Sequence, residues 1–143
     1  MPKADTFNIN KNNVSEKERV LELARKDVVS FGQLFLPEDY MKSTPAPYHY
    51  ELSDLLLDPD KKRNCIILPR GHSKSTLAKT ALLYHLYFNP EGKKEFIAWV
   101  AEEQSQAIDH IKYIQNHIEM NPALNYYFGD LRGSKWTEKE FTT

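Results

Sequence analysis

The spacing of apolar positions along the chain switches between two periods, and it predicts alternating helices and strands. Apolar residues three and four positions apart indicate helices over residues 15–30, 48–57, 74–88 and 107–118, with a shorter helix over 123–128. Two near-continuous apolar runs, residues 65–68 and 95–101, indicate strands, the second typical of a parallel strand covered on both faces. The order strand, helix, strand, helix predicts an α/β fold with a right-handed parallel crossover.

Capping and breaking residues set the expected bounds of these elements. Ser15 and Glu18 form a capping-box pattern at the start of the first helix. Asn89–Pro90 and Asn121–Pro122 are strong helix stops, and Gly129 suits the end of the short helix. We expect residues 31–40 to be aromatic and irregular, and residues 136–143 to begin another extended element.

The chain divides into a polar tail and one domain. Residues 1–14 predict a disordered N-terminal tail, and residues 15–143 predict a single unit. Because the sequence stops soon after the last extended element begins, we expect this unit to be the N-terminal part of a larger domain.

Composition narrows the possible classes of protein. The 143 residues are 41% hydrophobic and 12% aromatic, as in a globular protein. A net charge of −1 gives no global electrostatic case for nucleic acid, so any such contact must be local. The single cysteine, Cys65, lies in a predicted strand, where we expect a small core residue in a reducing compartment. No apolar run has membrane-spanning length and the polar start is no signal peptide, which predicts a soluble, intracellular protein.

The chemistry is concentrated where the first strand meets the 74–88 helix. A strand, a tight polar turn, Lys74–Ser75 and a helix form the layout of a phosphate-binding loop of the Walker A type. Backbone N–H groups at a helix N-terminus attract an anion, Lys74 adds full charge, and the Ser75 hydroxyl suits Mg²⁺. The candidate nucleotide-binding residues here are Pro69, Arg70, Gly71, His72, Ser73, Lys74, Ser75 and Thr76.

The loop departs from the strict pattern at both glycine positions, which Leu68 and Ser73 occupy. A left-handed conformation at Ser73 would cost about 1–2 kcal/mol, and Pro69 removes one donor N–H. A simple glycine-containing turn with a surface lysine therefore remains the alternative.

Each of the other polar residues near this loop has two possible roles. Arg70 is either an arginine finger for charge on the γ-phosphate or a surface residue paired with an acid. His72 either binds a phosphate or faces water. Glu102–Glu103 follows the second predicted strand and superficially resembles a magnesium-binding acidic pair, but we favour a role at the start of the next helix, where acids are stabilising.

Taken together, these residues resemble the ATPase domain of the large terminase subunit of tailed bacteriophages. The resemblance covers nearly the whole chain from about residue 28, and its specificity lies in the order and spacing of its pieces. They are residues 31–37, 48–49, 67–76, 88–90, 104–107, 121–122, 128–131 and 135–137.

The resemblance implies a P-loop NTPase fold, a parallel sheet with flanking helices, of which this chain holds an incomplete, N-terminal portion. It implies ATP and Mg²⁺ as cofactors, Arg70 as the family's loop arginine, Lys74 as the catalytic lysine, Ser75 as metal ligand, and Tyr48–His49 near the adenine. The implied partners are double-stranded viral DNA, the portal protein, the small terminase subunit and further copies in a ring, in the host cytoplasm.

The family's Asp-Glu catalytic pair and its nuclease domain have no counterpart here. We therefore expect this chain alone to hydrolyse ATP poorly or not at all. The alternatives are a helicase-like ATPase with the same loop, and a non-catalytic nucleotide-binding fragment.

Overall fold

The computed structural model describes residues 9–40, 42–61, 63–88, 96–137 and 139–143. The predicted stop at Asn89–Pro90, the start of the second predicted strand at Glu95 and the first eight residues of the predicted tail lie outside these ranges. The described residues form helices α1 (Ile9–Arg25), α2 (Val28–Phe35), α3 (Pro37–Tyr40), α4 (Pro47–Leu57), α5 (Lys74–Phe88), α6 (Gln104–Met120) and α7 (Pro122–Phe128).

The predicted sheet is wrong for the described part of the chain. Residues 65–68 and 96–101 are extended but unpaired, and the one β-bridge joins Trp136 to Phe141. A short apolar run becomes a strand only when a partner accepts its backbone hydrogen bonds, and no described residue does so here. The expected α/β fold of the P-loop NTPase class, with its parallel crossover, is therefore replaced by a helical body.

The four helices predicted after residue 47 are confirmed. α4 begins with Pro47 in its first turn, where proline loses no hydrogen bond. Asn121 accepts from the amides of Ala123 and Leu124 and so caps α7. Gly129 ends α7 at φ +86°, a conformation that glycine adopts freely.

The first predicted helix is wrong at both ends. α1 begins at Ile9, so Ser15 lies within the helix, and α1 ends at Arg25. Asp27 then starts a new helix: its carboxylate accepts from the amide and the hydroxyl of Ser30, at 2.7 and 2.9 Å. Residues 31–40, expected to be irregular, form most of α2 and all of α3.

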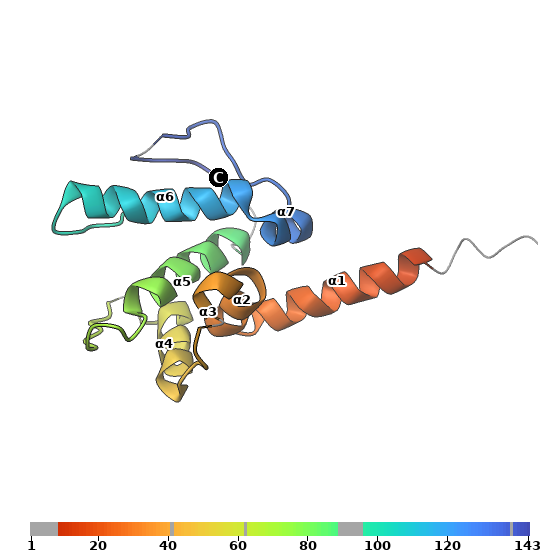
Figure 1. Cartoon of the computed structure of the whole chain (residues 1–143), viewed down its shortest axis with the longest axis horizontal. Helices are drawn as coiled ribbons and strands as arrows, with labels where there is room; N and C mark the ends of the chain where they lie inside the picture. The colour runs from red at the N-terminus through yellow and green to blue at the C-terminus, as the bar shows by residue number, and fades with distance from the viewer. Residues whose placement is uncertain (1–8, 41, 62, 89–95, 138) are drawn as a thin grey trace, which may run out of the picture.

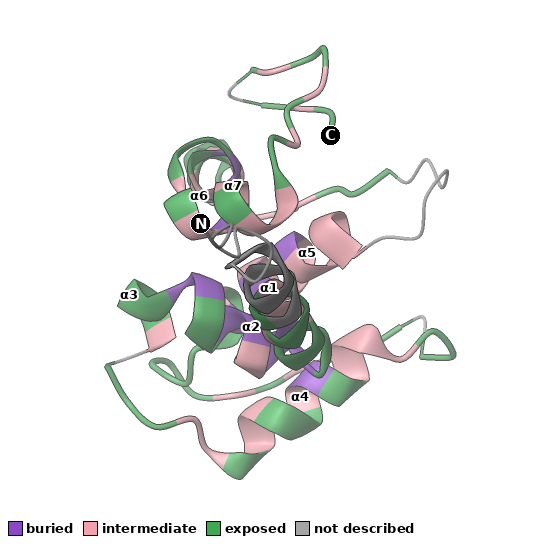
Figure 2. Ribbon diagram, turned by 90° about the vertical axis from the view of Figure 1, so that its right-hand side faces the viewer, coloured by how far each residue is buried: buried purple, intermediate pink, exposed green. Residues whose placement is uncertain are grey.

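The core is built around α2. Phe31 and Phe35 are 0% and 1% exposed, and their ring centroids lie 5.0 Å apart. Tyr84 and Phe128 bring α5 and α7 onto these rings at centroid distances of 5.7 Å from Phe31 and 5.5 Å from Phe35. Figure 2 shows the buried residues gathered on α2 and on the helix surfaces that face it.

α5 lies in the middle of the arrangement (Figure 1), with α6 and α7 on one side and α2 and α4 on the other. α1 projects away from this body, and its C-terminal part packs on α2. None of the described helices is long and apolar enough to cross a membrane. The end of α5 that carries Lys74 is therefore held by helices behind it, while the turn before it lies at the surface.

Candidate functional site: the turn before α5

The turn leading into α5 has an unusual backbone. Gly71 has φ +83° and Ser73 has φ +56°, and among described residues Ser73 is the one non-glycine residue with a positive φ. α5 begins at the next residue, Lys74. Ser73 therefore does adopt the left-handed conformation whose cost is given above, and it bends the chain sharply at the helix N-terminus.

The amides of this turn are available to a ligand. No described residue accepts a hydrogen bond from the backbone N–H of any residue from Gly71 to Thr76, whereas the Leu77 N–H donates to the Ser73 carbonyl at 2.8 Å. Free N–H groups at a helix N-terminus combine with the helix dipole to attract negative charge. The local geometry can therefore receive an anion without breaking any hydrogen bond of these amides.

Lys74 and Arg70 add positive charge around the same amides. Both are exposed, and neither forms an ion pair with a described carboxylate. The Lys74 ammonium instead donates to the Leu68 carbonyl at 2.6 Å, which folds the side chain back over its own turn. The surface-pairing alternative for Arg70 gains no support from the acids that the structure describes.

The structure brings Tyr48 close to the turn. The ring of Tyr48 lies 6.0 Å from that of His72 and 4.1 Å from that of His49, by centroid distance. His72 is exposed, and its Nδ1 lies 3.2 Å from the Arg70 carbonyl. Aromatic residues on α4 and cations on the turn therefore lie on one part of the surface.

His49 has a local role that sequence reasoning missed. The Ala46 amide donates to His49 Nδ1 at 2.9 Å, so the ring caps the first turn of α4. Since Nδ1 accepts, the neutral ring carries its proton on Nε2, and that atom is buried without a partner among described residues. A proline at the start of a helix, followed by a histidine two positions later, is the sequence pattern that could have indicated this cap.

The magnesium and acidic candidates lie in separate places. Ser75 is exposed in the first turn of α5, beside Lys74, where its hydroxyl suits a Mg²⁺ that also binds phosphate oxygens and water. Glu103 is the N-cap residue of α6, and its carboxylate accepts from the Ser105 hydroxyl at 3.3 Å. The helix-start interpretation of Glu102–Glu103 agrees with this position.

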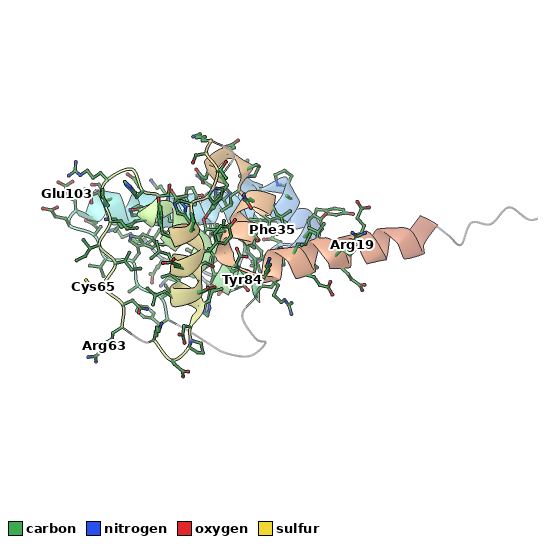
Figure 3. The ribbon with its side chains drawn as sticks, turned by 90° about the horizontal axis from the view of Figure 1, so that it is seen from below. Arg19, Phe35, Arg63, Cys65, Tyr84 and Glu103 are labelled. Carbon is green, nitrogen blue, oxygen red and sulfur yellow. The ribbon has the colours of Figure 1, made fainter. Side chains whose placement is uncertain are left out.

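Two residues expected in a buried strand are instead at the surface near the turn. Figure 3 shows Cys65, which is exposed, at the periphery of the molecule together with Arg63, far from Phe35 in the interior. Ile67 is 87% exposed. The turn thus follows an uncovered extended segment, so the support for its geometry must come from α5 and the helices behind it.

Comparison with known proteins adds no assignment: no family model, no curated protein and no solved structure matches this chain.

Proposed function

We propose that the chain binds Mg-ATP through the turn before α5. The observation that carries this proposal is the row of unengaged amides from Gly71 to Thr76 at the start of α5, beside the cations of Arg70 and Lys74. In this arrangement the amides hold the β-phosphate and Lys74 moves from the Leu68 carbonyl to an outer phosphate oxygen. Arg70 contacts the γ-phosphate.

The remaining nucleotide contacts follow from the positions of the neighbouring residues. Ser75 ligates Mg²⁺ through its hydroxyl, because it directly follows the lysine that holds the phosphates. Tyr48, 6.0 Å from His72 by ring centroid, offers an aromatic face to the base. Pro69, His72, Ser73 and Thr76 shape the turn around the phosphates.

We infer that this chain serves as the ATP-binding part of a DNA-packaging ATPase of the large terminase type. What supports this is the sequence resemblance from residue 28 onward, together with a helix that begins at the lysine of the loop. Its partners would then be double-stranded viral DNA, the portal protein, the small terminase subunit and other copies of itself in the host cytoplasm. The described residues form a helical body with no sheet, which differs from the fold that the resemblance implied. The proposal of ATP binding therefore rests on the site, and the terminase assignment rests on the sequence resemblance.

The first test is a titration of the chain with Mg-ATP by calorimetry, comparing wild type with Lys74→Ala. Removing a charge-assisted contact to phosphate should weaken binding at least about tenfold. Lys26→Ala is the matched control, since Lys26 is also exposed but lies beyond the end of α1. Equal affinity of wild type and Lys74→Ala would remove the lysine from the site.

Ser75→Ala separates the metal from the phosphates. If the hydroxyl ligates Mg²⁺, this variant should lose affinity for ATP in the presence of Mg²⁺ and bind like wild type when EDTA removes the metal. An equal loss in both conditions would mean that Ser75 acts only through the turn.

A further inference from the structure

A hydrogen-bonded relay runs beneath the turn from α3 into α5. The Tyr40 hydroxyl donates to Thr80 Oγ1 at 2.9 Å, and Thr80 Oγ1 donates to the Thr76 carbonyl at 2.8 Å. Thr80 is 0% exposed. Because Thr80 at the centre of the relay is buried, each bond orients the next one more strongly than it would at the surface.

The relay ends on the strained residue of the turn. The Thr76 carbonyl shares its peptide plane with the Leu77 amide, and that amide donates to the Ser73 carbonyl at 2.8 Å. Ser73 is the residue held at φ +56°. Fixing the Thr76–Leu77 peptide therefore fixes the N–H donor that holds the Ser73 carbonyl, and with it the direction of the amides before α5.

Tyr40 is held in place as a permanent donor. Burial raises its pKa to about 12, assisted by the negative charges of Asp39 and Asp27, so the hydroxyl keeps its proton at neutral pH. Its ring packs against Gly32 of α2 so closely that a Cβ at this glycine would overlap the ring atoms. The lack of a side chain at Gly32 thus leaves room for the Tyr40 ring beside α2.

We propose that Tyr40 is a positioning residue for the phosphate-binding turn and acts on it through Thr80 and the Thr76–Leu77 peptide. The proposal rests on the proposed function only in that the turn is the ATP site. Tyr40 itself contacts no ligand, because its hydroxyl is occupied by Thr80 beneath the first turns of α5. Through Tyr40, the four-residue helix α3 influences the shape of the site without contacting the ligand.

Amide hydrogen exchange in the ligand-free chain tests the relay without any nucleotide. Tyr40→Phe removes the first bond of the relay and Thr80→Val removes both, while each keeps the packed shape, and each should speed exchange of the Leu77 amide about fivefold. Thr80→Ser retains the hydroxyl and should exchange like wild type. Tyr113→Phe is the matched control, since it removes a hydroxyl that α3 also holds, through Asp39, but that is not connected to Thr76.

Mg-ATP affinity of the same variants supplies the second readout. Tyr40→Phe and Thr80→Val should weaken binding about fivefold, while Thr80→Ser and Tyr113→Phe bind like wild type. Unchanged Leu77 exchange in both Tyr40→Phe and Thr80→Val would overturn the relay. If wild type binds no Mg-ATP while the exchange pattern holds, the proposed function fails and the positioning of the turn by Tyr40 stands.

Discussion

Two apolar stretches of this chain, α2 and the extended residues 96–100, resemble each other in sequence but not in burial. α2 carries Phe31 and Phe35 at 0% and 1% exposure, whereas Phe96 and Val100 are 95% and 88% exposed. The helix satisfies about half of its backbone groups within itself, and Asp27 and Ser53 accept from amides of its first turn, so it needs neighbours mainly for its side chains and little for its backbone. The extended segment needs neighbours for both. Apolar character alone therefore does not decide burial.

Replacing one phenylalanine in each stretch by alanine should show the largest difference between the two stretches. Phe31→Ala should lower the free energy of unfolding by about 3–5 kcal/mol, since it leaves a cavity among the rings around α2. Phe96→Ala should change it by less than about 0.5 kcal/mol, because an exposed ring has little packing to lose. Chemical denaturation followed by circular dichroism measures both. A large effect of Phe96→Ala would show that the segment is covered in solution.

A second substitution tests how α2 satisfies its first amides. The Val28 N–H donates to Ser53 Oγ at 2.9 Å, and Ser53 is 0% exposed. Ser53→Ala should cost about 1–3 kcal/mol of unfolding free energy, since the buried amide keeps no acceptor. Ser105→Ala, at an exposed site in α6, is the control and should be nearly neutral. Similar values for the two variants would mean that water reaches Val28.

The smallest expected effect lies in the turn before α5. Ser73→Gly removes the penalty of φ +56° and should raise the unfolding free energy by about 0.5–1 kcal/mol, after the extra chain entropy of glycine is subtracted. Ser134→Gly, at a position where φ is not positive, is the control and should not raise the unfolding free energy. Loss of stability in Ser73→Gly would indicate that the serine side chain holds the turn.

Local signals in the sequence predicted the parts that depend on local interactions. The bounds of α4 and α7 follow from Pro47, Asn121 and Gly129, whose roles need few distant partners. The start of α5 at Lys74 belongs to the same group. These features are fixed by backbone geometry within a few residues.

The parts that failed depend on contacts between distant residues. Whether residues 65–68 form a strand is decided by a partner, and the periodicity of four residues carries no information about one. The sequence predicted an irregular, aromatic stretch over residues 31–40. In the structure the phenylalanines of this stretch belong to a central helix, which needs apolar residues on several of its faces. The relay from Tyr40 to Thr80 joins residues 40 positions apart, and nothing in either neighbourhood signals the pairing.

The contact between the Lys74 ammonium and the Leu68 carbonyl, 2.6 Å long, has a bearing on selectivity. If the turn binds ATP as proposed, a phosphate oxygen that takes the place of this carbonyl adds only the difference between its own bond to the ammonium and the bond that it replaces. In the proposed site that difference is small for an anion with a single charge and larger for a polyphosphate, whose several charged oxygens all attract the ammonium. A lysine that is already folded back onto its own turn would therefore favour polyphosphates over the common monovalent anions of the solution.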